Sequence, residues 1–365
     1  MKNIKCLVVL VISICIVVAG CVQHEVNEFK TYSNVYYTLQ YPSNWQDPVL
    51  NHSKVILMSN TNKLYFSIHQ MFYEGSLQDL MPEKEYEECV IDGVKGYVIE
   101  NKEGDEFYTF YVVPNNDMIF ELTFISQVDE DNNQETIDQV IESFQFNNFE
   151  TMSFGNWNKY STENIEVYYP DNSNIYDEVA KWSEQRQNAF NYVSEYLDVQ
   201  WDQEPIKMFV FNSREHGQQY GIQLGFAWPM YSQIYTLDIQ TKGHELAHCI
   251  SHHINSGMTI DSDLIEEGLA THLDMTGRDF HQLAADLLRE KSFKITLLGD
   301  KFREHENAYT FGASFVKYLI NEYSLDLFKE FYAQNKYNEE ESFKRFYNKD
   351  GRTLINEWIE LLKTY

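Results

Sequence analysis

Two histidines and a glutamate stand together in the stretch His244-Glu245-Leu246-Ala247-His248. In a helix, residues four positions apart lie on one face, so His244 and His248 would present two imidazoles to one point. Imidazole nitrogens are among the ligands that zinc prefers. Glu245 lies one position further round, where its carboxylate is placed to take a proton from a water molecule beside the metal. The spacing predicts a site for metal-assisted hydrolysis.

A second acidic phrase follows, with eighteen residues between His248 and Glu267 and then the run Gly268-Leu269-Ala270. The pattern HExxH-x18-E with a trailing GxA resembles that of the gluzincins, the thermolysin-like and aminopeptidase-N-like zinc metallopeptidases. The resemblance implies a second helix that carries Glu267, with small residues that let the two helices pack closely. Glu266 is the alternative ligand if the register differs by one residue.

The gluzincin resemblance implies one zinc ion per chain and assigns a role to each polar residue of the two phrases. The implied zinc ligands are His244, His248 and Glu267, and the implied general base is Glu245. The resemblance covers residues 244–312 most closely and extends over about residues 155–365. Its structural alternative is a metal-free pair of helices with coincidental spacing.

Tyr309 begins the phrase Tyr309-Thr310-Phe311-Gly312. In the aminopeptidase-N-like branch, a YxxG tyrosine at this place in the helical order stabilises the oxyanion, and the resemblance implies that role for Tyr309. A phenol that donates a hydrogen bond to the developing negative charge lowers the barrier to the tetrahedral intermediate. His305 is the rival donor. The structural alternative is a core aromatic residue, since the chain has 26 tyrosines.

The chain departs from the aminopeptidases upstream of the HExxH motif. Those enzymes carry a GxMEN segment whose glutamate binds the free amino end of the substrate, whereas YGIQLGFAWPMYSQIYTLDIQ contains no glutamate. An edge strand or hairpin predicted over residues 225–239 could still pair with an extended peptide through main-chain hydrogen bonds. These features favour an endopeptidase of the kind called peptidase-MA-like, and leave an aminopeptidase without the usual amine anchor as an alternative.

The remaining histidines and cysteines are predicted to have structural roles. His272 is expected to support the site or the fold rather than bind metal, and His252 and His253 to lie at or just past the end of the HExxH helix. His52 and His69 are isolated and are expected to be surface histidines or histidines with satisfied hydrogen bonds, and no role is assigned to His216 and His281. Cys249 is expected to be a small buried residue, and a disulfide with Cys89 is an open alternative. Asp261, Asp263 and Glu266 either line an acidic cleft or begin a solvated helix.

The secondary-structure elements that must position the candidate site residues are predicted to form an α+β fold. From about residue 25 to 148, β-branched and aromatic runs such as KLYFSIHQMF and DMIFELTFIS alternate with Asn, Gly, Pro and Asp. The run ETIDQVIESFQF has helical spacing. Together they predict a twisted antiparallel sheet with a helix against it. The phrases YTLQYPSNW and IDQVIESFQF resemble PsbP/Mog1-type α/β modules.

After an Asn-rich bridge, the pattern predicts a small sheet followed by helices. IEVYYP and IKMFVFN are predicted strands, Asp177–Leu197 is a predicted helix, and the chain from Asp263 to Tyr365 is almost wholly helical in pattern. The predicted organisation is a leader over 1–20, a PsbP-like module over 21–150 and a gluzincin-like metallopeptidase domain over 155–365.

The N-terminus predicts export and lipid attachment. Lys2 and Lys5 precede a short apolar run that fits a signal peptide, and the ending Val18-Ala19-Gly20-Cys21 resembles the lipobox of prokaryotic lipoproteins. This resemblance implies a lipid on Cys21 and a protein held on the outer side of the cell membrane; an ordinary signal peptide or an uncleaved anchor is the alternative. The formal charge of −28 argues against nucleic acid as a partner.

Two functions of different classes are consistent with the sequence. The first is a lipid-anchored zinc metallopeptidase that cleaves peptide or protein substrates outside the cytoplasm. The second is a surface binding lipoprotein in which the zinc fold is retained and catalysis is vestigial. The intact Glu245 favours the peptidase, because a purely structural metal site needs no base beside it. No pattern in the sequence indicates the side-chain specificity or the oligomeric state.

Overall fold

The computed structural model describes residues 28–51, 54–59, 64–73, 86–103, 105–127, 133–147, 154–254, 263–290, 302, 307–334 and 339–365. The predicted lipidation site Cys21 and the rival donor His305 lie outside these residues, as do His52 and Asp261. Within the described ranges, no helix has both the length and the apolar character needed to cross a membrane.

The N-terminal part of the chain is built on a seven-stranded antiparallel sheet. Its aromatic and β-branched strands are long, and tight turns at Asp92-Gly93 and Asn116, which have positive φ angles, connect neighbours. The strand order is β3 (Val49–Asn51), β4 (Lys54–Met58), β5 (Leu64–Phe72), β9 (Met118–Gln127), β8 (Glu106–Asn115), β7 (Val94–Glu103) and β6 (Glu87–Ile91).

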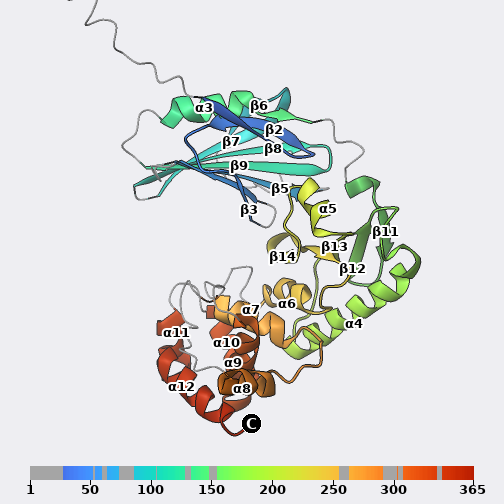
Figure 1. Cartoon of the computed structure of the whole chain (residues 1–365), viewed down its shortest axis with the longest axis vertical. Coiled ribbons are helices and arrows are strands. Elements are labelled where there is room, and N and C mark those ends of the chain that lie inside the picture. Colours follow the sequence, from blue (N-terminus) through green and yellow to red (C-terminus); the bar gives the residue numbers. More distant parts are fainter. Residues whose placement is uncertain are drawn as a thin grey trace, which may run out of the picture.

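A second, three-stranded sheet and one helix cover one face of the large sheet (Figure 1). The sheet contains β1 (Phe29–Ser33), β2 (Tyr37–Pro42) and β10 (Gln145–Phe146), and the helix is α3 (Asn133–Ser143). The ring of Phe144, just after α3, stacks on Tyr37 with ring centroids 5.0 Å apart. The sequence pattern predicted one antiparallel sheet; the short β1 and β10 ladders, which lack a strong alternation signal, form the second.

The middle of the chain forms a five-stranded mixed sheet. The strands β12, β13 and β15 are parallel, while β11 and β14 pair antiparallel at the two edges. Helices α4 (Val179–Leu197) and α5 (Arg214–Gln219) flank it. In order across the sheet, the strands are β11 (Asn158–Ser161), β12 (Ile165–Tyr169), β13 (Ile206–Phe211), β15 (Gln233–Leu237) and β14 (Phe226–Trp228).

Helix α4 begins two residues later than its pattern predicted. Residues Tyr176–Glu178 form a 3₁₀ turn, and the regular helix starts at Val179. Such tighter turns are common at helix starts. The predicted edge strand or hairpin before the HExxH motif is confirmed as β14 and β15.

The rest of the described chain is helical. The C-terminal helices pack around α9, which is mostly buried, and they make the core that also covers one face of the five-stranded sheet. They are α6 (His244–Ser251), α7 (Asp263–His272), α8 (Phe280–Glu290), α9 (Ala308–Glu322), α10 (Leu325–Gln334), α11 (Glu339–Tyr347) and α12 (Gly351–Leu362). The predicted mixed α+β class is confirmed.

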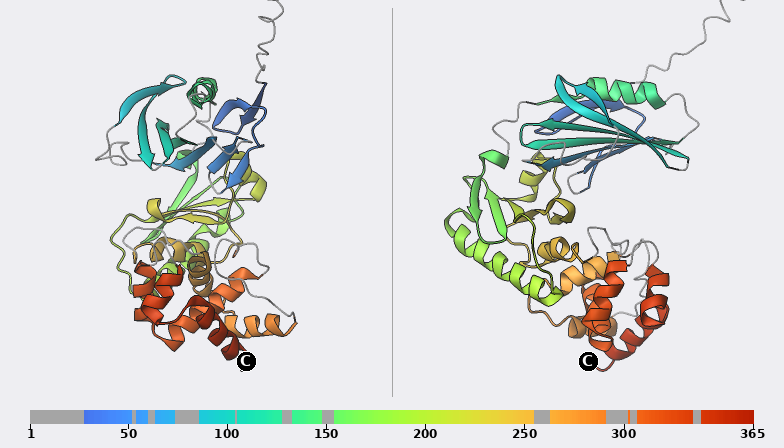
Figure 2. Two further views of the ribbon diagram at one scale, coloured as in Figure 1. Left: turned by 90° about the vertical axis from the view of Figure 1, so that its left-hand side faces the viewer. Right: turned by 180° about the vertical axis from the view of Figure 1, so that it is seen from behind.

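The other face of the five-stranded sheet shares one apolar core with the N-terminal sheets. Phe154 is completely buried at this junction and contacts Phe72 of β5 as well as Phe209 of β13, with ring centroids 6.1 and 4.6 Å away. The whole molecule is C-shaped, with the N-terminal sheets and the C-terminal helices as its two arms (Figure 2). Two apolar cores, one on each face of the middle sheet, join the arms to that sheet.

Candidate metal centre

Helix α6 places both histidines of the motif on one face. Its eight residues run from His244 to Ser251, and the rings of His244 and His248 lie 5.0 Å apart, almost perpendicular to each other. Gly243, just before the helix, lies against the backbone carbonyl of Leu273, where a Cβ atom would overlap that oxygen. The start of α6 is therefore held tightly against the end of α7.

Helix α7 brings Glu267 to the two histidines. Its Oε2 lies 3.3 Å from His244 Nε2 and 3.5 Å from His248 Nε2. Ligands at 2.0–2.1 Å from a tetrahedral zinc ion are about 3.3 Å from one another. One ligand atom from each of the three residues lies within 4.8 Å of the others. The donor set and its spacing fit a divalent cation such as zinc.

Two residues outside this group lie beside the Nδ1 atoms of the histidine rings, the nitrogens that do not face Glu267. Thr271 Oγ1, one turn beyond Glu267, lies 3.4 Å from His244 Nδ1. The Oε1 atom of Glu266 lies 3.7 Å from His248 Nδ1. Hydroxyls and carboxylates at this position orient a metal-binding imidazole and raise its basicity. The structure thus puts Glu267 in the group and Glu266 behind it, which favours the register chosen from the Gly-x-Ala continuation.

Glu245 is buried beside the same group. Its side chain is only 8% exposed, and it accepts a hydrogen bond from the backbone N–H of Ala227 in the edge strand β14. Burial raises the pKa of Glu245, while the neighbouring His244 and His248 lower it in part. Ala227 carries no sequence signal for this role, because any residue other than proline supplies a backbone N–H.

The charges of the group compensate one another. Burial alone would raise the pKa of Glu267, but hydrogen bonds with His244 and His248 hold that pKa far below its usual range. Burial would likewise lower the pKa of His248, and its acidic partners Glu266 and Glu267 instead raise it well above its usual range. The carboxylates therefore make this point strongly attractive to positive charge.

The position of Glu267 depends on a close contact between α7 and α9. A Cβ atom on Gly268 would lie 2.7 Å from the carbonyl oxygen of Gly312 and 2.9 Å from Val316 Cγ2. In return, a Cβ atom on Gly312 would lie 3.2 Å from Gly268 Cα. Gly268 thus permits the backbones of α7 and α9 to touch. The sequence predicted that the small residues after Glu267 allow close packing against the HExxH helix, whereas Gly268 packs against α9.

Tyr309 lies in the first turn of α9, close to the metal group. Its ring centroid is 6.0 Å from that of His244 and 6.2 Å from that of Phe302, and the side chain is 42% exposed. Its exposure and position are those of a residue at a site wall rather than in the core.

The other described histidines lie apart from the metal group. His272 ends α7 and lines, with Lys317, a cavity of about 350 Å³; burial lowers the pKa of His272 to about 4. His252 is the residue that caps α6, as predicted. Three further histidines make ring contacts with tryptophans: His69 with Trp228, His216 with Trp157 and His253 with Trp201. His281 forms a hydrogen bond with the hydroxyl of Ser314.

Both described cysteines are free. Cys249 is completely buried in α6, in agreement with its predicted packing role, and burial raises the pKa of its thiol. Cys89 lies in β6. The disulfide between Cys89 and Cys249 is therefore not formed.

No protein-family model matches this chain, and no curated protein matches it. Several solved structures are similar at low identity, among them the following three. Cyanobacterial PsbP (CyanoP) from Synechocystis sp. has 15% identity over 35% of this chain and 97% of that chain, with a TM-score of 0.27. A protein from Bacteroides thetaiotaomicron has 14% identity over 68% of this chain and 79% of that chain, with a TM-score of 0.28. Aminopeptidase A from Legionella pneumophila, in complex with aspartic acid, has 11% identity over 91% of this chain and 50% of that chain, with a TM-score of 0.38.

Replacement of Gly268 by alanine tests the contact between α7 and α9. Alanine is the better helix former by about 1 kcal/mol, so propensity alone predicts stabilisation. Overpacking against the Gly312 carbonyl costs typically about 1–3 kcal/mol, and we expect a net loss of unfolding free energy together with weaker zinc binding.

The matched control is Gly312→Ala, where the nearest atoms would be 3.1–3.3 Å away rather than 2.7–2.9 Å. We expect a smaller loss in denaturant unfolding for this variant. A Gly268→Ala protein that is more stable than the parent would contradict the importance of the helix contact.

Proposed function

We propose that this chain is a zinc-dependent metallopeptidase that cleaves within polypeptide chains. The observation that carries the proposal is the convergence of His244, His248 and Glu267 on one point, with the buried Glu245 beside them. Catalytic zinc sites in proteins typically have three protein ligands, whereas structural sites typically have four. Of the His, Cys, Asp and Glu side chains in the described ranges, these three form the group.

Zinc, when bound, polarises the scissile carbonyl and makes a nearby water molecule more acidic. The Glu245 carboxylate accepts the proton of the attacking water while the water oxygen bonds to the carbonyl carbon. Glu245 then returns the proton to the leaving nitrogen as the C–N bond breaks. Ala227 N–H holds the Glu245 carboxylate at the edge strand for this purpose. Burial keeps the pKa of Glu245 raised, which suits a group that must both accept and release a proton.

Tyr309 is proposed to donate a hydrogen bond to the oxyanion. The exposed position of its ring beside His244 supports this role, because the phenol has access to a bound carbonyl. The oxyanion bears more charge in the transition state than the carbonyl does in the substrate, so the hydrogen bond strengthens as the reaction proceeds.

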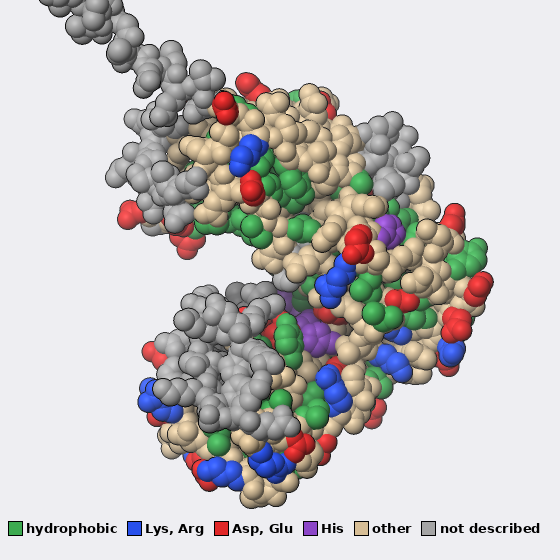
Figure 3. Space-filling model, in the orientation of Figure 1, with side chains coloured by type: hydrophobic (Ala, Val, Ile, Leu, Met, Phe, Trp, Pro, Cys, Tyr) green, Lys and Arg blue, Asp and Glu red, His purple; other side chains and the backbone are tan. Residues whose placement is uncertain are grey.

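Cleavage within chains is favoured over removal of N-terminal residues. The segment over residues 220–240, which is described throughout, has no glutamate that could bind a substrate's amino terminus. The space-filling view shows a hollow between the two arms, with histidine side chains at its inner end (Figure 3). An open hollow of this kind accommodates a chain that continues beyond the cleaved bond. A binding protein with vestigial catalysis is the second candidate, and it predicts zinc binding without hydrolysis.

We further propose that Cys21 carries lipid and holds the protein on the outer side of the cell membrane. The VAGC boundary after a short apolar run supports this location. We expect Cys21→Ser to remove the lipid and to release the protein from the membrane fraction. Mass spectrometry of the N-terminal peptide is the measurement, and wild-type protein without lipid on Cys21 would refute the attachment.

The Glu245→Gln substitution separates metal binding from catalysis. Glutamine has the same shape and cannot accept the proton, so we expect zinc content to remain one per chain while kcat/KM falls about 100- to 10,000-fold. Digestion of a peptide library, read by mass spectrometry, gives the activity, and elemental analysis gives the zinc content. Undiminished hydrolysis by this variant would remove Glu245 from the mechanism. A zinc-loaded wild-type protein that cleaves no peptide would favour the binding protein.

The Tyr309→Phe substitution tests the oxyanion donor. It removes only the hydroxyl, so zinc content and folding should persist while kcat falls about 100- to 1000-fold, equivalent to about 3–4 kcal/mol, with little change in KM. His305→Ala is the matched comparison. A Tyr309→Phe enzyme with normal kcat, beside a His305→Ala enzyme that has lost it, would transfer the role to His305.

A further inference from the structure

The seven-stranded sheet has apolar side chains on both faces. Along β5, Phe66, Ile68 and Phe72 point into the core beneath α3, whereas Tyr65 and His69 point to the opposite face. Antiparallel sheets with one solvated face usually carry polar residues there. On this sheet, strand pairing places the charged residues Lys54, Glu103, Glu106 and Glu121 on that face, and beside them it brings together six partly exposed apolar or aromatic residues. They are Met58, Tyr65, Ile99, Tyr108, Phe110 and Ile125, hereafter the open face.

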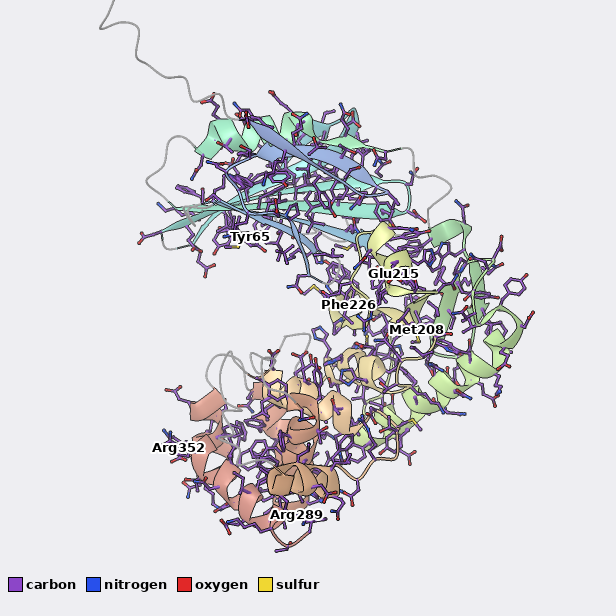
Figure 4. All side chains as sticks on the ribbon, viewed as in Figure 1. Tyr65, Met208, Glu215, Phe226, Arg289 and Arg352 are labelled. Atoms are coloured by element: carbon purple, nitrogen blue, oxygen red, sulfur yellow. The ribbon has the colours of Figure 1, made fainter. Side chains whose placement is uncertain are left out.

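The open face looks toward the hollow that contains the metal group. Tyr65 lies on the side of the sheet that faces the C-terminal helices, away from α3 (Figure 4). In the space-filling view, apolar side chains are visible on this arm where it borders the hollow (Figure 3). None of the six side chains carries a charge, whereas Glu106 and Glu121 of the same sheet face do, and the Tyr108 hydroxyl donates a hydrogen bond to Glu106.

The hairpin of β14 connects the open face to the metal group. Trp228 stacks on His69 with ring centroids 3.8 Å apart, and Trp228 and Tyr231 pack on the buried end of the same sheet face, beside Met71. One residue before Trp228, Ala227 donates its N–H to Glu245. The edge strand β14 therefore connects the buried Glu245 carboxylate, through Ala227 and Trp228, to the sheet face that carries the open face.

Two buried hydrogen bonds between the seven-stranded sheet and the middle part of the chain hold this connection in place. The side-chain amide of Gln233 in β15 donates to the carbonyl of Phe72, and that of Gln70 in β5 donates to the carbonyl of Tyr220. Both amide groups are buried, so breaking either bond would leave polar atoms unsatisfied. The sheet and the edge strand thus keep one relative position.

We propose that the open face binds aromatic and aliphatic side chains of an extended polypeptide substrate whose neighbouring residues lie along β14 at the metal group. This inference rests on the proposed peptidase function and names its substrate class: unfolded or flexible polypeptide segments, because folded proteins bury such side chains. Within the described strands, β14 pairs only with β15, so no further strand covers its other edge, and the Ala227 N–H is bonded to Glu245. The net negative charge of the protein disfavours acidic segments.

A triple variant removes the apolar character of the open face without disturbing its strands. Tyr65→Thr, Phe110→Thr and Ile125→Thr are made together, since threonine retains a high strand propensity. The matched control is Phe107→Thr in β8, which changes an aromatic residue of the same strand that points to the other face and is 41% exposed. Both sets are introduced into zinc-loaded Glu245→Gln protein, and circular dichroism and melting verify their folding.

The first measurement is fluorescence anisotropy with a long, labelled, unstructured peptide rich in Phe, Tyr and Leu. We expect the triple variant to bind this peptide at least about ten-fold more weakly than the parent and the control, since a few aromatic anchors dominate such interfaces. A peptide of equal length with serine at those positions should bind the parent as weakly as the triple variant binds the aromatic peptide. Equal affinity of parent and triple variant, or an equal loss in the Phe107→Thr control, would overturn the proposal.

The second measurement uses active enzyme with the same substitutions. The ratio of kcat/KM for the long peptide to kcat/KM for a short peptide should fall at least about ten-fold in the triple variant, through KM, and remain constant in the control. Failure of wild-type enzyme to hydrolyse any peptide would refute the peptidase, while the anisotropy result would still decide whether the face binds polypeptide. A wild-type dimer in sedimentation that the triple variant abolishes would assign the face to self-association and overturn the proposal.

Discussion

The contact between two glycines, Gly268 on α7 and Gly312 on α9, is the constraint on which the candidate site depends. The two backbones touch at a distance that leaves no room for a Cβ atom on Gly268. This contact fixes the height and rotation of α7, and therefore the place of Glu267 against the histidines of α6. Gly243 acts in the same way at the other end, where α6 meets the carbonyl of Leu273. These glycines make no contact with the metal position themselves. They set the separation of the helices that carry the candidate metal ligands.

Electrostatics explains why such a group can be buried at all. Glu245 and Glu267 are 8% and 6% exposed, and buried carboxylates are costly unless they are paired. In this chain the imidazoles of His244 and His248 compensate Glu267, and Thr271 and Glu266 hold those imidazoles from behind. A bound divalent cation would compensate the same carboxylates more completely. Substitution of any one of these residues alone is expected to destabilise the group, because it leaves a buried charged or polar partner without a compensating contact.

The N-terminal sheets contribute to the surroundings of the metal group rather than standing apart from it. They share an apolar core with the five-stranded sheet, and the stacking of His69 on Trp228 supports the hairpin that carries Ala227. Their open face borders the hollow at whose inner end histidine side chains lie (Figure 3). A chain segment bound at the metal group would therefore meet both arms of the molecule, which is how a module without catalytic residues of its own can influence selectivity.

Local sequence patterns were sufficient for the parts of this structure that depend on helix and strand geometry. The spacing of His244 and His248 determined that they share a face, since positions i and i+4 of any α-helix do so. The Gly-x-Ala run after Glu267 predicted close packing against the HExxH helix, but it did not indicate that Gly268 contacts α9. The aromatic and β-branched runs likewise predicted most strands of the N-terminal sheets and the α+β class. What the sequence could not determine was the pairing of distant groups: Glu266 behind His248, Ala227 against Glu245, and Trp228 on His69. Each of these contacts joins residues on different elements, so no periodic pattern in the sequence predicts it. The positions of those elements follow from how their apolar faces pack together, so only the tertiary structure decides which polar groups meet at the site.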